Sequence, residues 1–399
     1  MTGSALADRP SVQVFLVFLR LGLTSFGGPV AHLGYFHEAF VQRLRWLTAE
    51  TYGELVAMCQ CLPGPASSQV GFAIGLQRAG LAGGCAAWLG FTLPSAALMI
   101  GLGVGFGAVD PALWSGPLRG VKAAVVAVVA WALWQMAQML APTIRWRVIA
   151  ALAAVIALLQ PGVLGQLGAL LIAAVLARWA GALGTAPPSA GVNLALASIN
   201  TGVGALLAGA LLIVGLAVLP LLAAYTNHVA ITLIDSMYRA GSLVFGGGHV
   251  VLPLLHAETV TRGMVTAETL LAGYGMAQAL PGPLFAFGGW VGASVGGVSA
   301  GIVATIAIFL PGLLLVVAVM PLWGHLRSRP SLRRALAGLN AGVVGLVAAA
   351  LYDPVFIAGI TEWVDLAVAG AVLVALAHGR WPSWLLVVLS AGLGAVLYR

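Results

Sequence analysis

Long apolar segments recur along the whole chain and are separated by short polar stretches. A helix needs about 20 apolar residues to span the hydrocarbon core of a bilayer, so the pattern predicts an all-α polytopic membrane protein with roughly 13 spans, several of them short. The apolar segments cover residues 12–30, 55–76, 81–109, 121–140, 148–159, 163–177, 203–224, 231–255, 270–295, 300–322, 338–351, 364–377 and 384–398.

Several of these segments are interrupted by helix-breaking residues. Pro-Gly-Pro occurs at residues 63–65 and again at residues 281–283, and Phe-Gly-Gly begins at Phe26 and at Phe245. Proline removes a backbone donor and clashes with the preceding turn, and glycine tolerates the bend. Irregular backbone survives in a membrane only where it is buried in protein or lines a wet cavity. We therefore predict half-helices that end and begin at these breaks.

The interruptions belong to a longer internal duplication. The stretch RLGLTSFGGPV, which starts at Arg20, matches RAGSLVFGGGH from Arg239, and TAET occurs at both Thr48 and Thr266. Gln60 before the first Pro-Gly-Pro matches Gln278, FTLPS from Phe91 resembles IFLPG from Ile308, and GVKAAVVAVVA from Gly120 matches GLNAGVVGLVA. The offset stays at 217 to 219 positions throughout. We predict two homologous repeats, residues 1–185 and 227–399.

The connection between the repeats predicts their relative orientation. Residues 186–226 contain a Pro-rich linker and one extra apolar segment. Six spans per repeat would leave the repeats parallel, whereas one additional span inverts the second. Inverted repeats with broken helices are typical of secondary transporters, whose substrate sites lie near the midplane. Duplication with parallel packing is the alternative.

Composition supports a membrane protein and changes the meaning of the positive charge. Hydrophobic residues make up 61% of the 399 residues and charged residues only 7%, so the chain cannot cover a water-facing surface. With alternating spans, most arginines fall on the side of the N-terminus. The positive-inside rule then predicts a cytoplasmic N-terminus and a periplasmic C-terminus. The net charge of +7 therefore reflects membrane orientation and not nucleic-acid binding.

The broken helices also indicate what the protein binds. Free N–H groups at the start of a half-helix favour anions, and Ser67 and Ser68 add hydroxyl groups after the first Pro-Gly-Pro. The second repeat has Phe285 and Ala286 there, which predicts an asymmetric site. Arg20 and Arg239 lie at matching positions inside apolar segments, where a charge is costly and guanidinium suits oxyanions.

The sequence leaves structural alternatives open for several of these residues. An arginine can reach the interface or pair with a carboxylate such as Asp235, and Lys122 can simply extend from a helix end. The two TAET motifs are interpreted as helix starts, with a proton-coupling role for their glutamates as the alternative. The predicted substrate-binding residues are Arg20, Ser25, Gly27, Gly28, Gln60, Pro63, Gly64, Pro65, Ser67, Ser68, Lys122, Arg239, Gly246, Gly247, His249, Gln278, Pro281, Gly282, Pro283 and Asn340.

The motifs resemble those of a known family. FLRLGLTSFGGPVAHLGYF followed by CQCLPGPASSQVGFAIG, with FGGGHVVLPLL and ALPGP in the second half, is similar to the chromate ion transporter family in its long, two-domain form. The resemblance covers nearly the whole chain. It implies export of chromate across the inner (plasma) membrane and chromate resistance, with sulfate as the competing analogue.

The expected partners follow from this interpretation. We expect chromate and sulfate as ligands, the lipid bilayer as the surroundings, and no binding of nucleic acid. The sequence does not decide between a monomer and a homodimer. Uptake of sulfate or another oxyanion is the closest alternative function. We expect no catalytic residues, metal or cofactor, because the sequence contains no metal-ligand spacing, Ser-His-Asp set or phosphate loop.

Overall fold

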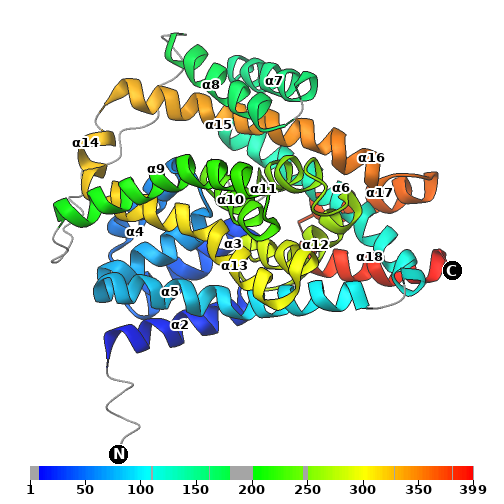
Figure 1. The fold of residues 1–399 in the computed structure, drawn as a ribbon, viewed down its shortest axis with the longest axis horizontal. Coiled ribbons are helices and arrows are strands. Elements are labelled where there is room, and N and C mark those ends of the chain that lie inside the picture. The colour runs from blue at the N-terminus through cyan, green and yellow to red at the C-terminus, as the bar shows by residue number, and fades with distance from the viewer. Residues whose placement is uncertain are drawn as a thin grey trace, which may run out of the picture.

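The computed structural model describes residues 9–108, 111–160, 162–179, 201–245, 250–327, 329–379 and 381–398. Within these residues every regular element is a helix (Figure 1). The first half contains α2 (Pro10–Thr24), α3 (Gly28–His37), η1 (Glu38–Arg43), α4 (Ala49–Cys61), α5 (Ala66–Ala108), α6 (Pro111–Leu140), α7 (Ile144–Leu159) and α8 (Val163–Trp179), and α9 (Thr201–Thr226) follows.

The second half repeats much of this order. It contains α10 (Val229–Leu243), α11 (Val251–Leu255), η3 (His256–Val260), α12 (Ala267–Ala279), η4 (Leu284–Ala286), α13 (Phe287–Val319), η5 (Met320–Leu322), α14 (Trp323–Arg327), α15 (Pro330–Ala350), η6 (Leu351–Phe356), α16 (Ile357–Gly359), α17 (Trp363–Ala377) and α18 (Ser383–Leu397). A π-helical turn lies at the corresponding place in each half, at η1 and at η3.

Helices end at the predicted breaks. α2 ends at Thr24, and α3 begins at Gly28, preceded by Gly27; both glycines have positive φ, 96° at Gly27 and 77° at Gly28. α4 ends just before the first Pro-Gly-Pro and α12 just before the second. The breaks in these three places are confirmed. The second Phe-Gly-Gly falls largely at residues 246–249, which lie outside the described residues, together with the predicted site residues Gly246, Gly247 and His249.

The first break reverses the chain. Phe18 of α2 packs with its ring centroid 5.5 Å from that of Phe36 in α3 and 4.9 Å from that of Phe40. A continuous helix rises 1.5 Å per residue and would hold residues 18 and 36 about 27 Å apart. Residues 12–30, expected to form one apolar span, are therefore two helices folded against each other. The total of roughly 13 spans stays a prediction.

The longest helix of each half contains the same sharp bend. In α5 the backbone leaves the helical region at Ala79 and Gly80, and in α13 it does so at Gly296 and Gly297. The second residue of each pair is left-handed, with φ 61° and φ 73°. Glycine adopts this conformation without the steric penalty of a Cβ. Each long helix is thus a short segment followed by a long one.

The long segments of α5 and α13 pack against each other in opposite directions. The rings of Trp88 and Phe309 lie 5.8 Å apart, and Ile100 approaches so closely that a Cβ on Gly301 would meet it at 2.9 Å. Position 100 follows 88 in α5, whereas 301 precedes 309 in α13. The two matching helices therefore run antiparallel at the centre of the molecule (Figure 1).

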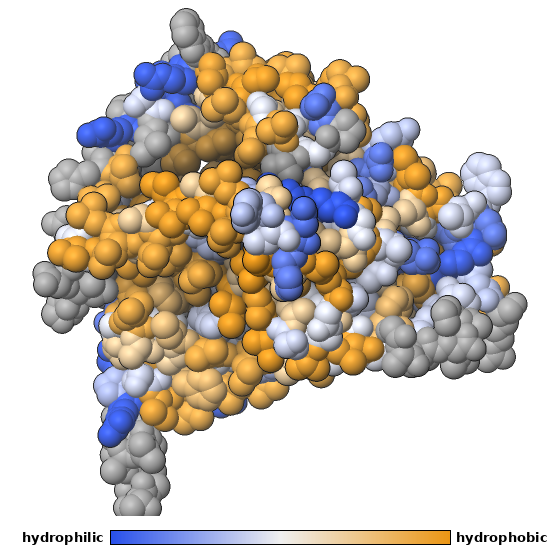
Figure 2. Space-filling view, in the orientation of Figure 1, coloured by the Kyte–Doolittle hydropathy of each residue, from blue (hydrophilic) through white to orange (hydrophobic). Residues whose placement is uncertain are grey.

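The outer surface is suited to lipid. Five helical stretches in the described residues are long and apolar enough to cross a bilayer: Ala66–Phe106, Trp114–Leu140, Gly202–Thr226, Leu284–Leu322 and Arg334–Gly359. The stretch in α9 has only 6% of its most apolar window buried. Figure 2 shows a broad hydrophobic face over α9 and its neighbours. An apolar face of this size would be unstable in water, so the chain is an integral membrane protein.

Candidate functional site

The breaks of the two halves are hydrogen-bonded to each other. The N–H of Gly64, in the first Pro-Gly-Pro, donates to the carbonyl of Val244 at 2.6 Å. The N–H of Gly282, in the second Pro-Gly-Pro, donates to the carbonyl of Ser25 at 2.9 Å. Ser25 and Val244 occupy matching positions at the ends of α2 and α10. Each Pro-Gly-Pro is therefore joined to the helix end of the opposite half. We call the meeting point of these two bonds, formed by Ser25, Gly64, Val244 and Gly282, the junction.

The predicted polar residues of the first half lie beside this junction. Ser67 and Ser68 are 3% and 2% exposed at the start of α5. Gln69 donates through Nε2 to the carbonyl of Pro63 at 2.8 Å and to that of Gly312 at 3.1 Å. Because both partners are carbonyls, the orientation of this amide is fixed. Gln69 thus ties the first Pro-Gly-Pro to α13.

His32 is one of the buried polar residues that sequence reasoning missed. It is fully buried, with Nδ1 3.3 Å from Oγ of Ser67, and its ring lies beside the backbone of Ser25. The ring packs edge-on against Phe91 at 5.1 Å. The sequence directed attention to His249 instead. A usable signal existed, since His32 lies one turn after the break at Gly28 and so faces the same side of α3.

The matching positions of the second half are apolar. Phe285, Ala286 and Phe287 replace the two serines and Gln69, and all three are buried. The asymmetry expected from the sequence is therefore present in the packing around the two breaks. At these three pairs of positions the hydroxyl and amide groups belong to the first half.

Several of these buried groups have no hydrogen-bond partner in the described part of the chain. They are Oγ of Ser25, Nε2 of His32, Oγ of Ser68, Oε1 of Gln69 and Oγ1 of Thr92. An unsatisfied buried polar group costs about 1–3 kcal/mol. Five of them near one junction therefore indicate a place that a polar ligand or water can occupy.

The two predicted arginines have different surroundings. Arg20 is exposed on α2, and only its backbone carbonyl has a described contact, the hydroxyl of Thr24 at 2.8 Å. Arg239 forms ion pairs with Asp235 and, at 2.8 Å, with Glu258. Arg262 joins the same two carboxylates. The charge of Arg239 is thus balanced inside the second half, as in the alternative that the sequence left open.

Lys122 and the TAET motifs also have partners. Nζ of Lys122 lies 3.0 Å from Oε1 of Glu268, so the pair links α6 to the start of α12. Thr48 and Thr266 accept hydrogen bonds from backbone N–H groups at 3.2 Å and 3.1 Å. The interpretation of both motifs as helix starts is confirmed.

The remaining predicted residues differ in burial and in the helices that carry them. Gln60 is exposed whereas its counterpart Gln278 is 8% exposed. Asn340 is half-buried on α15, which packs mainly against α7 and α8. At the breaks themselves Pro65 and Pro283 are buried beside the bonded glycines, and Pro63 and Pro281 are half-buried.

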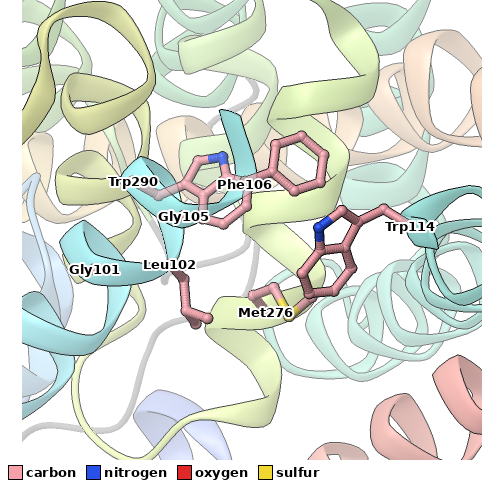
Figure 3. Close-up of a pocket in the computed structure, with 7 residues that line it drawn as sticks. All are labelled: Gly101, Leu102, Gly105, Phe106, Trp114, Met276 and Trp290. Carbon is pink, nitrogen blue, oxygen red and sulfur yellow. The ribbon is translucent and has the colours of Figure 1, made fainter. Parts of the chain in front are cut away.

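A cavity of about 120 Å³ lies elsewhere, between α5, α6, α12 and α13. Phe106, Trp114 and Trp290 line it together with Leu102 and Met276 (Figure 3). An oxyanion entering this space would lose its hydration and gain almost no hydrogen bonds, which is strongly unfavourable. The cavity is suited to an apolar group.

Comparison with known proteins identifies the family. The family model described as chromate transporter matches residues 12–181 and 231–395, which is most of the chain. The chain belongs to the chromate transporter family. The two matched regions fall on the two predicted repeats and leave α9 between them.

Several curated relatives in this family extend over most of the chain. The chromate transport protein of Pseudomonas aeruginosa is 28% identical over 86% of this chain and 80% of its own length. The chromate transport protein of Cupriavidus metallidurans is 27% identical over 85% of this chain and 81% of its own length. An uncharacterized transporter of Methanocaldococcus jannaschii is 24% identical over 86% of this chain and 84% of its own length. No solved structure matches the fold.

Proposed function

We propose that the protein is a secondary transporter that exports chromate across the inner membrane and so confers chromate resistance. Support comes from the family match and from relatives whose names describe chromate transport. The physical observation behind the proposal is the junction. There, helices begin beside buried hydroxyl and imidazole groups that have no hydrogen-bond partner among the described residues. Chromate and sulfate are both tetrahedral dianions, so sulfate competes for the same donors.

We infer that the transporter works through two inverted repeats, residues 1–185 and 227–399, with α9 in the connection 186–226. Three observations support inversion. The bends in α5 and α13 have nearly the same backbone angles, their long segments run antiparallel, and the hydrogen bonds between the breaks are reciprocal. Movement of one repeat against the other would expose the junction to each side of the membrane in turn.

The orientation belongs to the same proposal. The arginines that the sequence assigns to the side of the N-terminus include Arg78, at the end of the short segment of α5, where it lies 5.0 Å over the ring of Trp46. With the positive-inside rule this side is the cytoplasm, and the C-terminus is periplasmic. Arg20 and Arg239 stay predicted site residues. The buried hydroxyl groups are the stronger candidates for substrate contact, because Arg20 is exposed and Arg239 is paired with carboxylates.

The direction of transport is tested by chromate accumulation. Cells that lack their own chromate exporter and express this protein are expected to accumulate less chromate than cells with the empty vector, and to tolerate more. Uptake, the alternative function, gives the opposite result, with higher accumulation and greater sensitivity. Chromate transport is then measured with and without added sulfate, to test competition at the site. The same measurement in inverted membrane vesicles excludes an effect of sulfate on cell metabolism. Equal accumulation with and without the protein would contradict the proposal.

A further inference from the structure

Four buried polar side chains, each with an atom that has no hydrogen-bond partner among the described residues, lie on helices that meet at the junction. Ser25 follows α2, His32 lies on α3, and Ser68 and Thr92 lie on the short and long segments of α5. Their side chains are 0–3% exposed. His32 contacts Ser67, which precedes Ser68 in the chain, the ring of Phe91, which precedes Thr92, and the backbone of Ser25.

The second half shows that the fold does not need polar groups at these positions. Val244 stands where the first half has Ser25, Ala286 where it has Ser68, and Phe309 where it has Thr92. All three are buried, and the backbone breaks in the same places. Apolar packing is therefore available in this architecture, and it would avoid the cost of unsatisfied polar groups. The first half has a reason other than packing to keep them.

The orphaned atoms are suited to an oxyanion. In the tautomer in which Ser67 donates to Nδ1 of His32, the free Nε2 carries a hydrogen and can donate. The hydroxyls of Ser25, Ser68 and Thr92 can donate as well. The helices α3 and α5 begin at the junction, and their N-terminal dipoles favour negative charge.

We propose that Ser25, His32, Ser68 and Thr92 form a binding site for one tetrahedral oxyanion, with Nε2 of His32 as a direct ligand. The site rests on the proposed function and specifies its substrate-binding residues. It is built from neutral donors of the first half. Gln69 is a positioning residue, because its Nε2 is committed to the carbonyls of Pro63 and Gly312.

The test measures anion binding separately from transport. The full-length protein is purified in detergent, and its thermal unfolding is followed at increasing sulfate, chromate or phosphate. A ligand that binds only the folded state raises the unfolding temperature with its concentration, which gives an apparent affinity. His32→Gln, Ser68→Ala and Thr92→Val are compared with the wild type, and the same variants are assayed for chromate accumulation.

Thr305→Val is the matched control for Thr92→Val. Thr305 is a buried threonine on the corresponding helix, α13, but its hydroxyl is satisfied by the carbonyl of Gly301 at 2.8 Å. We expect the control to keep the wild-type anion affinity. His32→Gln and Thr92→Val should each bind sulfate and chromate about tenfold more weakly, which corresponds to about 1.4 kcal/mol.

The unfolding temperature without anion gives an independent readout. Replacing an unsatisfied buried hydroxyl by a methyl group of similar shape removes a desolvation cost, so Thr92→Val should be as stable as the wild type or more stable. Reduced anion affinity at undiminished stability is expected of a ligand and not of a structural residue. If one of the three variants fails to fold, the other two still test the proposal, because all three alter the same site.

The outcomes distinguish the site from the function. Anion affinities within twofold of the wild type in all three variants would overturn the proposed site, while chromate export by the wild type would leave the proposed function standing. A wild-type protein that neither binds any of the three oxyanions nor changes chromate accumulation would overturn both.

Discussion

Oε2 of Glu258 lies 2.8 Å from the guanidinium of Arg239, and both side chains are withdrawn from the surface, at 1% and 16% exposure. The pair joins η3 to α10 and shares its charges with Asp235 and Arg262. Two carboxylates and two guanidinium groups make the cluster neutral. The sequence left open whether Arg239 binds substrate or pairs with a carboxylate such as Asp235, and the structure shows it paired with two carboxylates of its own half.

This cluster predicts that Arg239 acts mainly on stability. Removing one member of a buried ion pair leaves an uncompensated charge and costs about 3–5 kcal/mol. Arg239→Ala and Glu258→Gln should therefore both lower the unfolding temperature of the purified protein. The double variant Arg239→Met with Glu258→Met removes both charges and should be more stable than either single variant. A stable Arg239→Ala protein with weakened anion binding would instead identify Arg239 as a ligand.

The glycines of the two Pro-Gly-Pro motifs are expected to be indispensable. Gly64 has φ 124° and Gly282 has φ 98°, and a Cβ on either would lie 2.7 Å from a neighbouring side-chain atom. Strained backbone of this kind costs about 1–3 kcal/mol. Gly64→Ala and Gly282→Ala should each lower both stability and chromate export. Gly34→Ala is the control, because Gly34 lies in α3 with nothing within 4 Å of its Cβ position and should be tolerated. Full activity of both junction variants would contradict this account.

The ion pair between Lys122 and Glu268 should contribute little. The side chain of Glu268 is 60% exposed, and exposed pairs are typically worth about 0–1 kcal/mol. Glu268→Gln should therefore change the unfolding temperature only slightly and leave chromate accumulation within about twofold of the wild type. Loss of export in a normally inserted Glu268→Gln protein would support the proton-coupling alternative for the TAET glutamates.

Orientation can be measured with reporter fusions. An enzyme that is active only in the periplasm should be inactive when fused before residue 1 and active when fused after residue 399, if the N-terminus is cytoplasmic and the C-terminus periplasmic. A reporter active only in the cytoplasm should give the reverse pattern, which serves as the control. Termini on the same side would contradict an odd number of crossings and with it the proposed orientation.

Sequence alone determined the features that depend on a few adjacent residues. Proline and glycine restrict the backbone locally, so helix ends at Ser25, Leu62 and Leu280 were predictable, as were the caps at Thr48 and Thr266. Apolar composition determined the class of protein, because a chain with so few charged residues is stable only in lipid. The family was equally accessible, since its motifs are contiguous.

Tertiary structure decided which distant residues meet. The fold-back that brings Phe18 against Phe36, the carboxylates that neutralise Arg239, and the burial of His32 beside Ser67 depend on how helices pack. The sequence left open whether Arg239 binds substrate or pairs with Asp235, four positions away, and only packing adds Glu258 and Arg262 to that pair. It passed over His32, because the partner of that ring, Ser67, lies 35 positions along the chain. Local backbone chemistry fixes where a helix ends, but only packing decides what lies opposite that end.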